Sequence, residues 1–191
     1  MISEFGLVSL TLVLLLSSLS FTKLLFSFSR LSFSVVNEVK ISGLIFLLTL
    51  SSFLSLTYSF IISDFSLEVI YKNSNSQLPL IYKITGVWGN HEGSILLWLL
   101  VMTFFGFLFS LYNLKKIEFK ELVLTIQNSL IFLMSLFVLI TSNPFSREFP
   151  PRIEGSDLNP LLQDPGLAIH PPFLYLGYVG FSIVYSISLA V

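Results

Sequence analysis

The chain contains two histidines, His91 and His170, and no cysteine. Each histidine stands directly before a long apolar stretch. Imidazole titrates near neutral pH and is a common metal ligand, whereas the lack of cysteine excludes disulfides, Cys-based zinc or iron–sulfur sites and thiolate nucleophiles from this sequence. The binding chemistry of the chain is therefore expected to depend first on these two imidazoles.

The first histidine lies in the segment Trp88-Gly-Asn-His-Glu-Gly-Ser94. Asn90 or Ser94 can cap the N-terminus of a helix. One interpretation is a capped helix start, with the tryptophan of this segment and Trp98 as anchors at the membrane interface. The other is that His91 and the glutamate beside it bind a ligand or a metal, for which one His next to one Glu is a weak indication.

The second histidine lies in the segment Asn159-Pro-Leu-Leu-Gln-Asp-Pro-Gly-Leu-Ala-Ile-His-Pro-Pro-Phe-Leu-Tyr-Leu-Gly-Tyr-Val-Gly180. Pro171 disfavours helical backbone at His170, so we expect an extended residue there and a last helix that starts at Pro171 and Pro172. An imidazole held by two prolines among aromatic side chains suits axial ligation of a planar apolar cofactor such as haem. Alternatively, His170 hydrogen-bonds a loop carbonyl and the aromatic residues form an interfacial belt. These aromatic residues are Phe173, Tyr175 and Tyr178.

The elements that carry these segments are expected to lie in a membrane. Of the 191 residues, 54% are hydrophobic and 11% are charged, and the mean hydropathy is +0.86, whereas soluble domains carry about 25% charged residues. The net charge of -1 offers no basic surface for nucleic acid. We therefore expect the chain to lie in a lipid bilayer and to have no nucleic-acid partner.

Five apolar stretches reach the length of about 20 residues that a membrane span needs. The sequence thus predicts an all-α, polytopic membrane protein that forms one transmembrane domain over residues 1–191. Lys23, inside the first stretch, is expected to reach the membrane surface through its long side chain. The predicted spans are about 5–29, 41–63, 93–114, 122–143 and 171–191, and two long loops cover 64–92 and 144–170.

Lysine and arginine are denser in the short loops, which places these loops on the inner side of the membrane. The N-terminus, both long loops and both histidines are then expected on the outer side. The basic residues of the short loops are Arg30, Lys40, Lys115, Lys116 and Lys120.

The abundance of Phe and the presence of only two alanines favour an A/T-rich genome, such as that of a mitochondrion or a reduced bacterium.

Together, segments 86–98 and 159–180 resemble the N-terminal part of CcmF, the multi-span haem-handling subunit of the cytochrome c maturation system. The resemblance covers nearly the whole chain but about the first third of a family member. It implies that His170 is an axial ligand of the iron of a haem held on the outer face. His91, Trp88 and Tyr175 are kept as further candidates for cofactor binding, and no catalytic side chain is implied.

The resemblance also implies the partners. The haem chaperone CcmE delivers a b-type haem in transit, and a CcmH-type subunit presents the Cys-x-x-Cys-His thiols of apocytochrome c. The family's Trp-rich segment, its second outer histidine and both histidines of its membrane haem are absent from this sequence. The haem site is therefore expected to be shared with remaining CcmF polypeptides, as from a split mitochondrial gene, and the isolated chain is expected to bind haem weakly or not at all.

Two functions follow as hypotheses. The first is an N-terminal membrane fragment of a cytochrome c haem lyase, in the mitochondrial or alternatively a bacterial inner membrane, which helps hold haem for thioether attachment and is an enzyme only as a subunit. The second is a structural accessory subunit of an inner-membrane respiratory complex that has lost haem chemistry.

Overall fold

The computed structural model describes residues 1–28 and 37–191, and this described part is helical apart from its loops and an isolated antiparallel bridge between Leu67 and Arg147. The expected all-α fold is therefore confirmed. The elements are α1 (Ile2–Phe28), α2 (Glu38–Ile61), α3 (Glu68–Asn73), α4 (Leu80–Gly86), α5 (His91–Leu111), α6 (Ile117–Thr141), the short 3-10 helix η1 (Pro160–Gln163), α7 (Pro165–Val179) and α8 (Phe181–Ala190).

The described residues contain five helical stretches that are long and apolar enough to cross a membrane, which is the predicted number. The last stretch, Ala168–Ala190, combines most of α7 with α8. Residue 29, the expected end of the first span, and Arg30 lie outside the described residues. The five stretches are Ile2–Phe26, Glu38–Ile61, His91–Leu111, Ile117–Thr141 and Ala168–Ala190.

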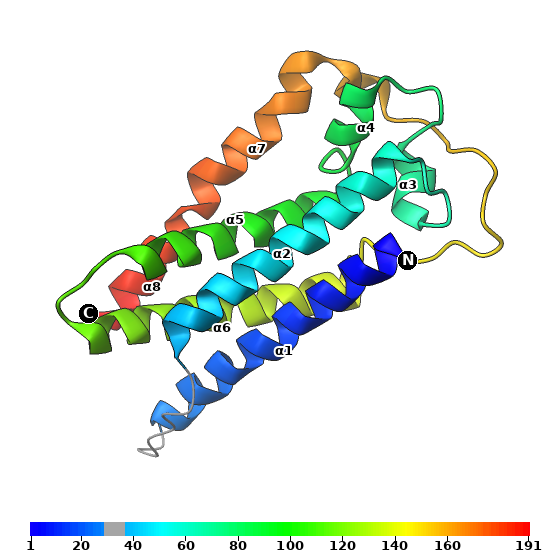
Figure 1. Cartoon of the computed structure of the whole chain (residues 1–191). Helices are drawn as coiled ribbons and strands as arrows, with labels where there is room; N and C mark the ends of the chain where they lie inside the picture. Colours follow the sequence, from blue (N-terminus) through cyan, green and yellow to red (C-terminus); the bar gives the residue numbers. More distant parts are fainter. Residues whose placement is uncertain (29–36) are drawn as a thin grey trace.

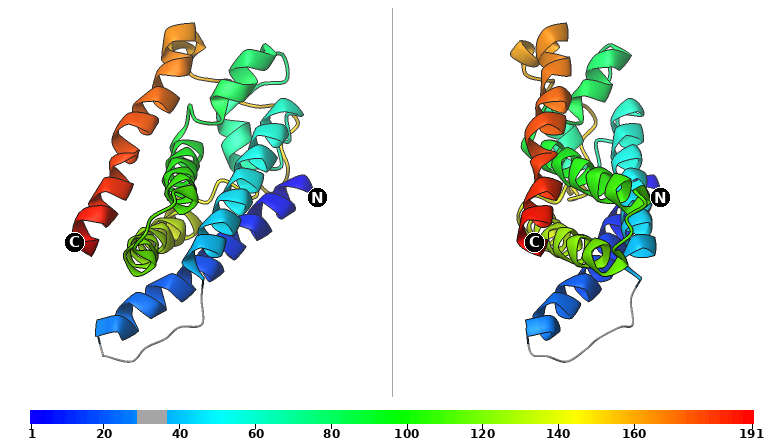
Figure 2. Two further views of the ribbon diagram at one scale, coloured as in Figure 1. Left: turned by 60° about the vertical axis from the view of Figure 1, so that its left-hand side comes forward. Right: turned by 90° about the vertical axis from the view of Figure 1, so that its left-hand side faces the viewer.

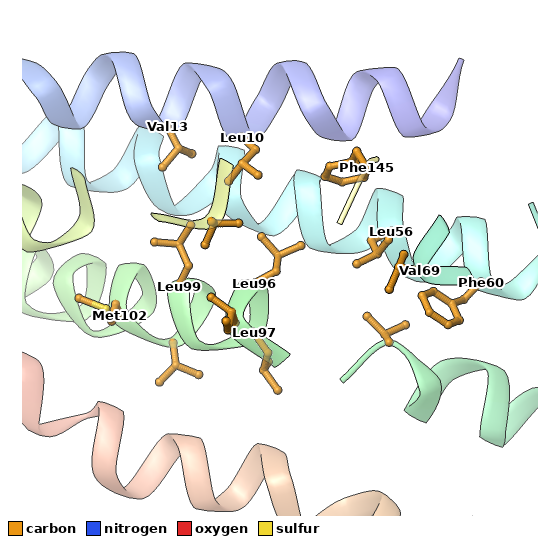
Figure 3. Packing of buried hydrophobic residues seen from close by; sticks show 14 of the residues in the cluster. Leu10, Val13, Leu56, Phe60, Val69, Leu96, Leu97, Leu99, Met102 and Phe145 are labelled. Atoms are coloured by element: carbon orange, nitrogen blue, oxygen red, sulfur yellow. The ribbon is translucent and has the colours of Figure 1, made fainter. Parts of the chain in front are cut away.

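Helices α1, α2, α5 and α6 pack side by side, and α7 with α8 runs along one edge of this bundle (Figures 1 and 2). A cluster of buried hydrophobic residues lies between them, and Figure 3 shows part of its packing. The bundle buries 56% of the α6 span but only 11% of the last span. The last span therefore presents most of its apolar surface to lipid or to another chain. Fully buried core residues include Leu10 and Val13 of α1, Leu56 and Phe60 of α2, and Leu96 and Leu99 of α5.

The N-terminus and the two long loops meet at one end of the bundle (Figure 1). Arg147 forms an ion pair with Glu4 and donates a hydrogen bond of 3.0 Å to Ser3 Oγ. In the same region, the backbone N–H of Ser76 donates to the Glu154 carboxylate at 2.9 Å. This arrangement agrees with the predicted connectivity, and the side of the membrane that this end faces stays a prediction.

Lys23 forms two ion pairs at the end of the bundle where α1 ends and α2 and α6 begin. Its Nζ lies 3.2 Å from Glu38 Oε1 and 3.4 Å from Glu121 Oε2. The Glu38 side chain is fully buried and also accepts hydrogen bonds from Ser20 Oγ at 2.7 Å and Asn128 Nδ2 at 3.0 Å. The two carboxylates compensate the charge of the partly buried ammonium. The position of Lys23 relative to the membrane surface stays a prediction.

Candidate functional site

The segment around His91 folds as a capped helix start. Asn90 has extended backbone angles, and its Oδ1 accepts a hydrogen bond of 2.7 Å from the N–H of Gly93. Its amide nitrogen donates 2.7 Å to the carbonyl of Gly86 at the end of α4. A Cβ on Gly93 would lie 1.6 Å from the Val87 carbonyl oxygen, so the close approach of the preceding loop requires glycine here. The predicted cap is confirmed, with Asn90 as its residue.

His91 is the first residue of α5, and its Nε2 lies 2.9 Å from Ser142 Oγ, which follows the last turn of α6. This hydrogen bond ties the beginning of α5 to the end of α6. Within residues 1–28 and 37–191, no group of three or more His, Asp or Glu side chains could hold a metal ion. The interpretation of His91 and Glu92 as a metal site therefore finds no third ligand among these residues.

A cleft of about 300 Å³ lies where the two motifs meet. Trp88 and His91 line it from the first motif, and Ala168, Pro171 and Tyr175 line it from α7. The structure thus brings three of the four predicted site residues to one cleft: Trp88 from the turn after α4, His91 from the start of α5 and Tyr175 from α7.

A hydrogen bond joins the two motifs directly. Trp88 Nε1 donates to the carbonyl oxygen of Ala168 at 2.7 Å, across 80 positions of the sequence. Next to it, a Cβ on Gly89 would come within 3.1 Å of the Leu162 side chain, so η1 is packed closely on this turn. The structure therefore gives Trp88 a backbone partner in α7, a contact that is not predictable from the local sequence.

The local prediction for His170 is wrong. The residue is helical, because α7 begins at Pro165 and continues through Pro171 and Pro172. The N–H of Ala168 donates a hydrogen bond of 2.8 Å to the carbonyl of Asp164, so the first helical turn forms before His170. The preference against helix before proline is a statistical bias that tertiary contacts can override, and the contact between Trp88 and Ala168 is one of them.

His170 lies on the side of α7 that faces away from the cleft. Successive helical residues are 100° apart, so His170 points opposite to Ala168, which is buried. The imidazole is exposed, and so are its apolar neighbours Ile169 (51%), Phe173 (69%) and Leu174 (50%). The structure therefore does not bring His170 together with His91; it leaves His170 accessible to a ligand outside this chain.

Tyr175 belongs to an aromatic group on the inner side of the last span. Its ring centroid lies 6.3 Å from that of Trp98 and 5.5 Å from that of Tyr178. Trp98 and Tyr178 also line a larger apolar groove of about 550 Å³ between α5, α6 and the last span. No histidine lines this groove.

Comparisons with known proteins agree with the two motifs. A family model described as cytochrome C assembly protein matches residues 88–191, which include both histidines. The chain is 55% identical over 146 residues to the cytochrome c-type biogenesis protein CycK of Rhizobium meliloti, which covers 76% of this chain and 22% of the relative. It is 45% identical over 149 residues to CcmF of Escherichia coli, which covers 77% of this chain and 23% of the relative.

A solved structure extends this similarity to the fold. The structure named cytochrome c heme lyase CcmF superposes with a TM-score of 0.80 at 26% identity, and the match covers 100% of this chain and 30% of that one. The chain thus spans less than a quarter of the length of these two curated relatives and less than a third of the solved structure.

Proposed function

Because the chain belongs to the cytochrome c assembly protein family, we propose that it is the N-terminal membrane part of a cytochrome c haem lyase. Its role is to help hold haem at the outer face of the membrane while thioether bonds to apocytochrome c form. In this proposal, residues outside these 191 complete the haem site. The names of the relatives support a place in cytochrome c biogenesis.

The observation that carries this proposal is the position of His170. An exposed imidazole surrounded by exposed apolar side chains fits haem, which is planar and apolar and whose iron takes imidazole as an axial ligand. Ile169, Phe173 and Leu174 form the apolar surroundings. His91 lies on the cleft behind α7, so the second axial ligand comes from the remaining polypeptide.

In this proposal haem is a substrate, and the chain supplies no nucleophile. A cysteine S–H of apocytochrome c adds across each haem vinyl group: a C–S bond forms, the hydrogen goes to the neighbouring vinyl carbon, and no net oxidation occurs. The chain contributes orientation, because His170 fixes the haem relative to α7 and so presents the vinyl groups to the incoming thiols.

The partners in this proposal are the remaining CcmF polypeptides, a CcmE-type haem chaperone, a CcmH-type subunit and apocytochrome c. The compartment is the mitochondrial inner membrane, with the end that carries His170 in the intermembrane space. A bacterial inner membrane, with this end in the periplasm, is the alternative.

The proposal is tested by purifying the native chain in a gentle detergent and identifying its partners by mass spectrometry. A haem absorption spectrum is recorded for the wild type and for His170→Ala. We expect Trp-rich CcmF polypeptides to copurify, with a haem signal that weakens in the variant. Recovery of respiratory-complex subunits with an unchanged spectrum would instead support the structural accessory role.

A further inference from the structure

Two consecutive prolines inside α7 leave one carbonyl without a partner in the helix. A helical C=O accepts from the N–H four residues later, or three residues later in a 3-10 turn. For Ala168 these positions are Pro172 and Pro171, and neither has an N–H. Ala168 is only 4% exposed, so its carbonyl requires a donor from elsewhere in the protein.

The indole of Trp88 is that donor, at 2.7 Å. Trp88 itself is held in the turn after α4, where its N–H and that of Gly89 both donate to the Thr85 carbonyl at 3.3 and 3.0 Å. The following residue, Asn90, caps α5. The bond therefore attaches the first turns of α7 to a fixed point at the beginning of α5.

This attachment bears on His170, which stands between Ala168 and the two prolines. No hydrogen bond of the His170 ring is found within residues 1–28 and 37–191, and the bundle buries only 11% of the last span. The helical turn that bears His170 therefore sets the direction of the Cα–Cβ bond from which the imidazole extends.

We propose that Trp88 is a positioning residue: through the carbonyl of Ala168, its indole N–H sets the direction in which His170 meets the haem iron. The inference rests on the proposed function and assigns to Trp88 a task other than contact with the cofactor.

Three variants separate the N–H from the ring. Trp88→Phe keeps an aromatic side chain and removes the donor. Pro172→Ala provides a backbone N–H at the fourth position after Ala168, so the double variant offers its carbonyl a new partner within the helix. Trp98→Phe is the matched control, because the Trp98 indole contacts Tyr175 and Tyr178 through its rings.

The first measurement needs no haem. Hydrogen exchange of the amides of residues 166–170 is followed in the full chain in lipid nanodiscs. Loss of one buried hydrogen bond corresponds to about a tenfold change in a local opening equilibrium. We expect about tenfold faster exchange in Trp88→Phe, exchange near the wild-type rate in the double variant, and no change in Trp98→Phe.

The second measurement uses the haem lyase assembled with its remaining polypeptides. The electron paramagnetic resonance signal of the bound haem reports the orientation of the axial imidazole, and the rate of haem attachment to apocytochrome c reports function. Trp88→Phe is expected to shift the signal and slow attachment about tenfold, and Pro172→Ala is expected to restore both.

Wild-type exchange and a wild-type haem signal in Trp88→Phe would overturn the inference. Defects that Pro172→Ala does not rescue would also overturn it, since they would result from the smaller ring and not from the lost N–H. The proposed function fails separately: it is contradicted if His170→Ala leaves the haem signal unchanged. Loss of the signal in His170→Ala together with wild-type behaviour of Trp88→Phe would overturn the role of Trp88 alone.

Discussion

Ser186 of α8 donates a hydrogen bond of 2.8 Å to the amide oxygen of Gln127 of α6, a side chain that is fully buried. The amide nitrogen of Gln127 donates to the carbonyl of Met102 at 3.2 Å and to Ser182 Oγ at 3.1 Å. One side chain thus joins α5, α6 and α8. Because the bundle buries so little of the last span, these bonds are a principal attachment of α8 within this chain.

This attachment is tested with two serines of α8. Ser186→Ala removes the bond to Gln127, whereas Ser188 is exposed and donates only to the Val184 carbonyl of its own helix. Hydrogen bonds between membrane helices contribute about 0.6–2 kcal/mol, so we expect Ser186→Ala to lower the free energy of unfolding by about 1 kcal/mol. The free energy of unfolding in detergent is measured for Ser186→Ala and for the control Ser188→Ala, and equal losses in the two variants would argue against the attachment.

The buried network around Glu38 gives a second prediction. Lys23→Met leaves the fully buried Glu38 carboxylate without its cation, and breaking such a pair costs about 3–5 kcal/mol. Lys72 pairs with Glu68 on the surface, where an ion pair contributes about 0–1 kcal/mol, so Lys72→Met is the matched control. Similar unfolding curves for the two variants would show that the Glu38 network does not stabilise the fold.

Two glycines differ sharply in their surroundings. Gly93→Ala would place its Cβ 1.6 Å from the Val87 carbonyl oxygen, whereas a Cβ at Gly177 meets nothing within 4 Å. We expect Gly93→Ala to lower the yield of folded chain severely. Gly177→Ala should keep or raise stability by up to about 1 kcal/mol, since alanine favours helix.

The same alanine at Gly177 also reports on what covers α7. If Gly177→Ala leaves the isolated chain stable but slows haem attachment in the assembled lyase, a partner or the haem packs against this face. Size-exclusion chromatography and haem staining of cytochrome c separate the two effects. A loss of stability in the isolated chain would contradict the open surroundings of Gly177.

Acid is expected to loosen the contact between the two long loops. Hydrogen bonds from the Ser76 hydroxyl and N–H hold the pKa of Glu154 below its ordinary value of 4.5. A depressed carboxyl pKa stabilises the fold fully above the ordinary value, and this contribution is lost as the pH falls through the folded-state value. Hydrogen exchange at residues 75–77 should therefore be constant from pH 7 to 5, after correction for its intrinsic pH dependence.

Below pH 4.5 the corrected exchange should rise in the wild type, because Glu154 becomes protonated. Glu154→Gln removes the titrating group, so its corrected exchange should not change with pH. A rise of equal size in this variant would assign the loosening to another carboxyl group.

The sequence predicts the spans because length and hydropathy are local properties. It predicts the cap at Asn90 for the same reason, since the cap bonds to Gly93 three residues later. The ion pair between Lys23 and Glu121 was not predicted, because the two residues are 98 positions apart and such pairing leaves no local signal. The helical state of His170 was not predicted, because a distant residue, Trp88, supplies the hydrogen bond to Ala168 that offsets the preference against helix before proline.

Gln127 shows the same limit of sequence analysis. A polar residue such as Gln127 in an apolar span indicates that a partner exists, but the identity of Ser182 and Ser186 as partners depends on how α6 and α8 pack. For the candidate site, the sequence could therefore indicate both histidines but could not predict that they lie on opposite sides of α7.

The most direct test of the central claim is chemical rescue of His170 in the assembled haem lyase. His170→Gly removes the imidazole, and free imidazole is added back while the haem spectrum and covalent haem attachment are followed. We predict loss of the low-spin haem signal and of attachment in the variant, and recovery of both with imidazole. A His170→Gly lyase with a wild-type spectrum and wild-type attachment in the absence of imidazole would contradict the assignment of His170 as an iron ligand.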